Sequence, residues 1–167
     1  MYREIQVISL VGIAMTAVLC DLWSGRIPNA VIAVGLAMGL ICHFFAEGAI
    51  GVILSLGGMC LPMLLFGVLY YFRMIGAGDI KLLCVAGSFL GPTGVLSCIV
   101  RTLFVAAVFS IVILYRKHSL GKRLAYLRRY VCDYAESGKW QPYIEQAGED
   151  AKFCFSVPVL IGILMGI

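Results

Sequence analysis

Six long apolar runs, separated by short polar turns, constrain the fold of this chain more than any other feature. Most are close to the roughly 20 residues with which an α-helix crosses the hydrocarbon core of a bilayer. The hydrophobic fraction of 62% and the charged fraction of 13% exclude an ordinary soluble domain. The sequence therefore predicts an all-α polytopic membrane protein, a single domain over residues 1–167, with six transmembrane helices. Their expected ranges are 2–20, 29–46, 49–72, 79–90, 94–115 and 153–167.

The run at residues 79–90 is the shortest, and it ends at Gly91-Pro92. As a helix it is about 18 Å long, which is too short to cross a hydrocarbon core of roughly 30 Å. Either Asp79 or the Gly91-Pro92 turn therefore lies below its membrane face, and we expect the first. The G-x-x-x-G spacings that begin at Gly35, Gly87 and Gly162 suggest close helix contacts, a weak signal in a chain with 19 glycines.

The segment 116–152 is the only long polar stretch. Leu120, Leu124, Leu127 and Val131 recur in it at helical spacing, while charged side chains take the opposite face. This pattern predicts an amphipathic helix that lies on anionic membrane lipid.

Charge distribution predicts which side of the membrane each turn faces. Six crossings place Arg26, Arg73 and the basic residues of segment 116–152 on one side, which is the cytoplasm by the positive-inside rule. Asp21 follows the first run and Asp79 begins the fourth. Both carboxylates are therefore expected at the cytoplasmic face, with segment 116–152 as a cytoplasmic loop.

The stretch Gly76-Ala77-Gly78-Asp79 is the strongest candidate for a functional site. A charged side chain is costly to place at a membrane, so a chain that keeps one there commonly uses it. Gly76 and Gly78 remove side-chain bulk beside the carboxylate and leave room for another backbone. Asp21 has a comparable position at the end of the first run, and the two acids suggest one shared site.

Two carboxylates that share one water cannot both ionise easily, so one keeps a proton. The charged one can deprotonate the water while the protonated one polarises a peptide carbonyl, which is aspartic proteolysis without metal or other cofactor. Seven cysteines without a C-x-x-C pair do not indicate a zinc site. Helix dipoles favour charge on Asp79, which opens a helix, over Asp21, which closes one. The shared proton is therefore predicted on Asp21, with Asp79 as the initial base.

Each of these residues also has a structural interpretation. Asp21 would be a helix-end residue facing water, and Asp79 the N-cap of the fourth helix. Lys81 would be a counter-ion to the acids, a substrate contact or an interfacial lysine that reaches toward water. Pro28 and Asn29 are expected to begin and brace the second helix.

At these residues the chain resembles the type IV prepilin peptidases, the bacterial and archaeal branch of the GxGD intramembrane aspartyl proteases. The resemblance rests on Asp21 followed by Arg26-Ile27-Pro28-Asn29, on Gly76-Ala77-Gly78-Asp79-Ile80-Lys81-Leu82, and on the six-run layout. It implies a multi-span protein of the prokaryotic cytoplasmic membrane with Asp21 and Asp79 as the catalytic pair. Its substrates would be prepilins, pseudopilins or preflagellins, cut between a short basic leader and an apolar helix. No nucleic-acid partner is expected.

The larger members of that family carry an amino-terminal cytoplasmic domain, often with paired cysteines for zinc, and also methylate the new amino terminus. Here only 20 residues precede Asp21, and no C-x-x-C occurs. We therefore expect a short form, like the Tad/Flp prepilin or archaeal preflagellin peptidases, without methyltransferase activity.

Two other classes of protein stay open on the residues alone. A small ion- or proton-coupled transporter would use Asp79, Lys81 and Arg101 as a charge relay, although the inverted repeats typical of transporters are not found. A non-catalytic scaffold for pilus assembly would keep the fold without cleaving anything. Replacing Asp21 or Asp79 by Asn would separate the three.

Overall fold

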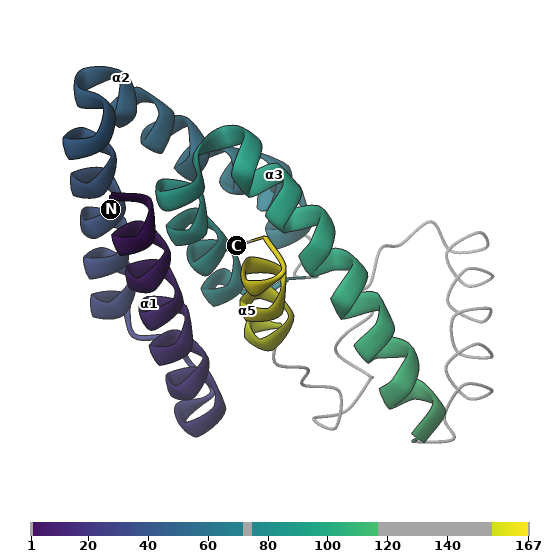
Figure 1. The fold of residues 1–167 in the computed structure, drawn as a ribbon. Coiled ribbons are helices and arrows are strands. Elements are labelled where there is room, and N and C mark those ends of the chain that lie inside the picture. Colours follow the sequence, from purple (N-terminus) through teal and green to yellow (C-terminus); the bar gives the residue numbers. More distant parts are fainter. Residues whose placement is uncertain (1, 72–74, 117–154, 167) are drawn as a thin grey trace. The chain divides into compact units, whose positions relative to one another are not determined.

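The computed structural model describes residues 2–71, 75–116 and 155–166, and these residues form helices without any strand (Figure 1). The elements are α1 (Tyr2–Ser24), α2 (Asn29–Tyr71), α3 (Ala77–Arg116) and α5 (Ser156–Leu164). The all-α prediction is thereby confirmed for the described residues. The predicted amphipathic helix in segment 116–152 lies almost wholly outside them.

The chain divides into two compact units. Residues 1–105 and 154–167 form the first, which contains every candidate site residue, and residues 106–153 form the second. In the second unit the described residues are the last turns of α3, whose side chains from residue 107 to residue 112 are exposed.

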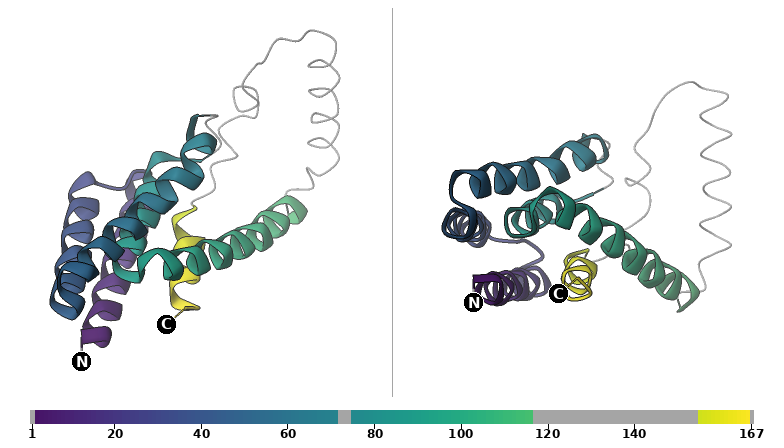
Figure 2. Two further views of the ribbon diagram at one scale, coloured as in Figure 1. Left: turned by 90° about the horizontal axis from the view of Figure 1, so that it is seen from above. Right: turned by 45° about the horizontal axis from the view of Figure 1, so that its top comes forward.

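Two glycines divide the long elements into shorter helical segments. Gly48 has φ 63° within α2, and Gly91 has φ 68° within α3. Both angles lie in the left-handed region, which glycine adopts without the steric cost that a side chain brings. The resulting segments, residues 29–47, 49–71, 77–90 and 92–116, agree closely with four of the predicted runs. Figure 2 shows the sharp turn that each break introduces.

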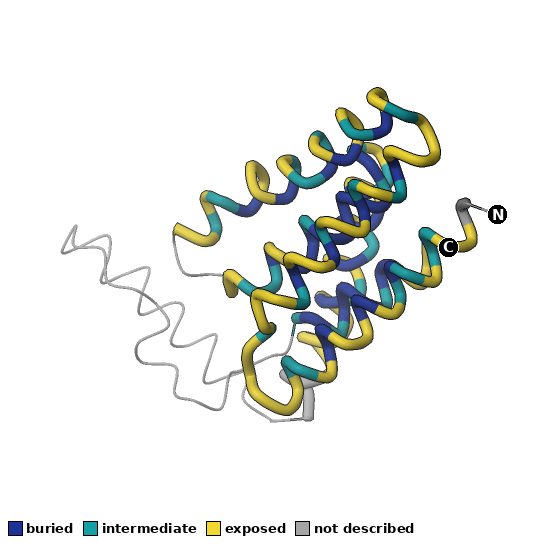
Figure 3. Tube along the Cα trace, turned by 90° about the vertical axis from the view of Figure 1, so that its left-hand side faces the viewer, coloured by how far each residue is buried: buried dark blue, intermediate teal, exposed yellow. Residues whose placement is uncertain are grey.

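Three helices are long and apolar enough to cross a membrane: residues 4–24 of α1, 29–71 of α2 and 77–112 of α3. Many large apolar residues on these helices are exposed. Figure 3 shows how exposed positions alternate with buried ones along the helices. With nine residues, α5 is about 14 Å long, which is shorter than a bilayer core. These findings support a membrane protein, while the six crossings stay a prediction.

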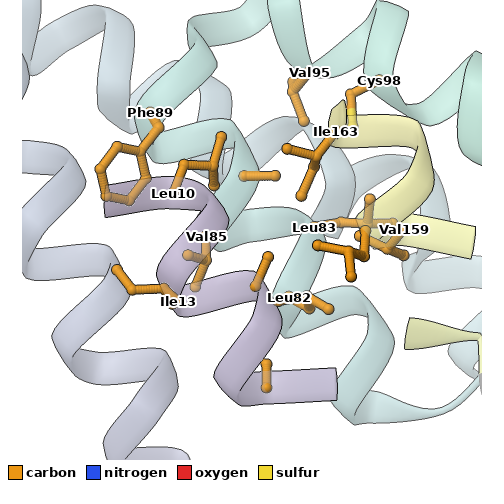
Figure 4. Close-up of a cluster of buried hydrophobic side chains, with 14 of the residues drawn as sticks. Leu10, Ile13, Leu82, Leu83, Val85, Phe89, Val95, Cys98, Val159 and Ile163 are labelled. Atoms are coloured by element: carbon orange, nitrogen blue, oxygen red, sulfur yellow. The ribbon is translucent and has the colours of Figure 1, made fainter. Parts of the chain in front are cut away.

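The first segment of α3, residues 77–90, is largely buried. Leu82, Leu83, Val85 and Ala86 are at most 1% exposed. Figure 4 shows side chains of α1, α3 and α5 packed together, among them Leu10, Val85 and Val159. This apolar cluster packs the helix that carries Asp79 against α1 and α5.

Glycines let the two segments of α2 approach α3 closely. A Cβ at Gly58 would overlap the Gly87 carbonyl group, and a Cβ at Gly87 would overlap that of Gly58. Gly35 and Gly39 likewise lie against Val85 and Ser88. The close contacts suggested by the G-x-x-x-G spacings are confirmed at these positions, and backbone contact of this kind is common between membrane helices.

The break at Gly91-Pro92 leaves carbonyl groups that side chains of α2 satisfy. Pro92 has no N–H for the carbonyl of Ser88, four residues earlier, and Ser55 Oγ donates to that carbonyl at 2.9 Å. His43 Nε2 donates to the Phe89 carbonyl at 3.0 Å. His43 is therefore a buried partner of the broken helix.

Candidate active site

Asp21 lies in the last turn of α1. The sequence placed the end of this helix at Cys20, but the helix continues to Ser24 because Gly25 ends it. Gly25 has φ 61°, and its N–H donates to the Asp21 carbonyl at 2.8 Å, which is the hydrogen bond of a glycine C-cap. The predicted polar turn at residues 21–28 is therefore four residues shorter than expected.

Asp79 lies in the first turn of α3, which begins at Ala77. Its carboxylate accepts a hydrogen bond from the Gly76 backbone N–H, and Gly76 in turn accepts one from the Ile80 N–H at 3.4 Å. Asp79 is thus not the N-cap residue of its helix. Instead it is a third-position acid whose side chain reaches back to the residue before the helix, in the manner of a capping box.

The two motif glycines have different surroundings. A Cβ at Gly76 would lie 3.0 Å from Asp79 Oδ2, which is closer than side chains normally approach. A Cβ at Gly78 would lie 3.5 Å from Ile27 Cδ1, which is an ordinary van der Waals distance. Gly76 therefore keeps space free beside the carboxylate, whereas Gly78 packs against the turn before α2.

The Arg26-Ile27-Pro28-Asn29 motif docks on the start of α3. Besides the contact of Ile27 with Gly78, Lys81 Nζ donates to Asn29 Oδ1 at 2.8 Å. Asn29 is the first residue of α2, and the Pro28 carbonyl accepts the first helical hydrogen bonds, from Val31 at 3.1 Å and Ile32 at 3.4 Å. Lys81 thus has a role that the sequence did not suggest, which is to tie α3 to α2.

Asp21 and Asp79 belong to the same compact unit and lie near enough for the charge of Asp21 to act on the Asp79 carboxyl group. Both side chains are partly buried. Acids 58 positions apart in the sequence are therefore brought to one end of the helix bundle. Such an arrangement can hold a water between an acid and a base.

Ser156 is a neighbour of Asp21 that sequence reasoning missed. Its hydroxyl donates to Asp21 Oδ2 at 2.5 Å, and Ser156 is fully buried at the start of α5. The only signal in the sequence was a hydroxyl residue two positions before Pro158 in the last apolar run. A donor to a carboxylate oxygen favours its ionised form. The prediction that the shared proton lies on Asp21 did not include this donor, and it stays a prediction.

Among the described residues, no three His, Cys, Asp or Glu side chains gather in a way that could hold a metal ion. The five described cysteines are not joined in disulfides. The described groups around Asp21 and Asp79 are the hydroxyl of Ser156 and the backbone of Gly76.

Comparison with known proteins identifies the family. A family model described as Peptidase_A24, type IV leader peptidase family, matches residues 8–114, which include Asp21, the Pro28-Asn29 turn, both motif glycines, Asp79 and Lys81. The match confirms the resemblance that these motifs suggested. Comparisons with curated proteins and with solved structures gave no significant match. The chain belongs to the type IV leader peptidase family, whose members are proteases.

Proposed function

We propose that this protein is an aspartic endopeptidase that removes the short basic leader from type IV prepilin-like precursors, with Asp21 and Asp79 as its catalytic pair. The observation that carries the proposal is the placement of these two carboxyl groups in one compact unit, at the end of α1 and the start of α3, near enough for the charge of Asp21 to act on Asp79. Membership of a leader peptidase family supports the same reaction class.

The proposed reaction needs one carboxylate and one carboxylic acid. The carboxylate takes a proton from water, and the acid polarises the scissile carbonyl while the water oxygen forms a bond to its carbon. The base then gives its proton to the leaving amine, the C–N bond breaks, and the pair returns to its starting charge. Gly76 supports this mechanism because it leaves the approach to Asp79 Oδ2 unobstructed.

Exposed aromatic side chains support a site at the membrane surface. Trp23 is 95% exposed, two residues after Asp21, and Tyr71 is 82% exposed at the end of α2, shortly before the glycine motif. Trp and Tyr concentrate where lipid headgroups meet water. A cut between a basic leader and an apolar helix would occur at that depth. By the positive-inside rule we expect this end of the bundle to face the cytoplasm. The family suggests the inner membrane of a prokaryote, where anionic lipid is an expected partner.

The proposal can be tested by co-expressing the protein with a prepilin-type substrate and following the loss of its leader. Asp21→Asn and Asp79→Asn should each abolish cleavage. Glu47→Gln is the matched control, because Glu47 is an exposed acid beside the Gly48 break of α2. Cleavage that survives in either Asn variant would exclude the dyad. Loss of ion flux in those variants without any cleavage by the wild type would favour a transporter instead.

A further inference from the structure

The last helix brings a hydroxyl group to one of the two carboxyl groups, although 135 residues separate them in the sequence. Ser156 is 0% exposed, and the Asp21 carboxylate is the acceptor of its hydroxyl at 2.5 Å. Ser156 lies outside residues 8–114, which the family model matches. Nothing in the catalytic scheme above uses it.

We propose that Ser156 is a positioning residue for the reaction, which fixes the orientation of the Asp21 carboxylate. The proposal rests on the function proposed above. A short hydrogen bond to a charged oxygen is stronger and more directional than one between neutral groups. It occupies Oδ2 of Asp21 and leaves Oδ1 for the water.

The surroundings of α5 support this role because they fix where Ser156 sits. Gly162 lies directly against Thr102 of α3, where a Cβ would overlap the Thr102 hydroxyl. At the far end of α5, Arg101 donates to the Met165 carbonyl at 3.3 Å. Figure 4 shows Val159 and Ile163 of α5 within the apolar cluster, close to Leu83 and Cys98 of α3. Ser156 is therefore held at one end of a short helix that is anchored along its length.

The first turn of α5 also helps to fix the position of Ser156. Pro158 is the third residue of the helix, where its missing N–H costs no helical hydrogen bond because the first N–H groups of a helix have no partner within it. Proline also stiffens the first turn, since its ring fixes φ. The turn that carries the Ser156 hydroxyl is thus rigid.

The test uses the full-length protein in proteoliposomes and a prepilin substrate with a short basic leader, for which kcat and KM are measured separately. Ser156→Ala should lower kcat by about 10- to 100-fold, the effect expected for losing a hydrogen bond to a charged group, with KM changed less than about threefold. Ser156→Thr should restore most of the rate, because it returns the hydroxyl. A purely structural role predicts instead that kcat falls only in proportion to the loss of folded protein.

A second pair of variants keeps the test decisive if Ser156→Ala folds poorly. Thr and Val have nearly the same shape and differ in a hydroxyl against a methyl group, so Ser156→Thr should be active and Ser156→Val slow at equal thermal stability. Equal kcat in these two variants would overturn the proposal.

The Asn variants separate this inference from the function on which it rests. If Asp21→Asn still cleaves, the catalytic pair itself is wrong. If Asp21→Asn is inactive while Ser156→Ala and Ser156→Val keep the wild-type kcat, the pair stands and only the role of Ser156 is overturned.

Discussion

The Lys81 ammonium group donates a hydrogen bond to the Asn29 side-chain oxygen at 2.8 Å and so joins the first turn of α2 to the start of α3. The two residues come from the two sequence motifs that resemble the type IV prepilin peptidases. Their contact shows how the motif after Asp21 and the motif around Asp79 are held against each other, although neither residue touches the other motif's acid in the described contacts.

This contact predicts that Lys81 and Asn29 act as a pair. Asn29→Ala and Lys81→Met should each lower the thermal stability of the protein in detergent, and the double variant should lose little more than either single one. The coupling should be about 1 kcal/mol, the usual net value of one hydrogen bond. Strictly additive losses in this cycle would show that the hydrogen bond adds no stability.

The two motif glycines should respond differently to alanine. Gly76→Ala should lower kcat at least tenfold, because its Cβ would press on Asp79 Oδ2 from 3.0 Å. Gly78→Ala should leave thermal unfolding nearly unchanged, since its Cβ meets Ile27 at an ordinary 3.5 Å. If Gly78→Ala is stable but inactive, we would infer that the substrate packs against Gly78. A Gly76→Ala protein with full kcat would contradict our account of that glycine.

Ser55 should stabilise the broken helix. Its hydroxyl donates a hydrogen bond to the Ser88 carbonyl, to which Pro92 cannot donate because it has no N–H. Ser55→Ala should therefore lower the free energy of unfolding by about 1–3 kcal/mol, because it leaves a buried carbonyl without a donor. Ser97→Ala is the control, because the Ser97 hydroxyl bonds to the Thr93 carbonyl at an exposed position of α3. Equal melting temperatures for the two variants would argue against this role.

The contact between Gly58 and Gly87 should tolerate no side chain. Gly58→Ala places a Cβ on the Gly87 carbonyl group and should destabilise the protein by at least about 1–3 kcal/mol. Gly67 lies in the same segment of α2, and a Cβ added there would meet nothing within 4 Å. Gly67→Ala should therefore stabilise the helix slightly, by up to about 1 kcal/mol. The free energies of unfolding of the two variants can be measured by denaturant unfolding in mixed micelles.

Much of this architecture was predictable from hydrophobic runs and their breakers. Gly91-Pro92 marked a true break, and Glu47-Gly48 marked another. The exact end of α1 was not predictable, because Asp21-Leu22-Trp23-Ser24 is compatible with a polar turn and with a last helical turn. The left-handed conformation of Gly25 is what ends the helix after Ser24. The sequence also suggested a sixth crossing, whereas the described helix at that end has nine residues.

The candidate site was predictable in part for a similar reason. Asp21 and Asp79 stand out because charge is rare in apolar runs, and so do the glycines beside Asp79. Ser156 does not stand out, since serine is common in membrane helices and its role depends on a contact across 135 residues. The partnership of Lys81 with Asn29 depends on tertiary packing in the same way.

The backbone contact between Gly58 and Gly87 also limits which parts of the molecule can move when a substrate enters. Interlocked main chains cannot slide past each other without first separating, so the second half of α2 and the first half of α3 act as a fixed frame that carries Asp79. Asp79 is then the fixed member of the two acids, and its separation from Asp21 depends on how α1 packs against this frame.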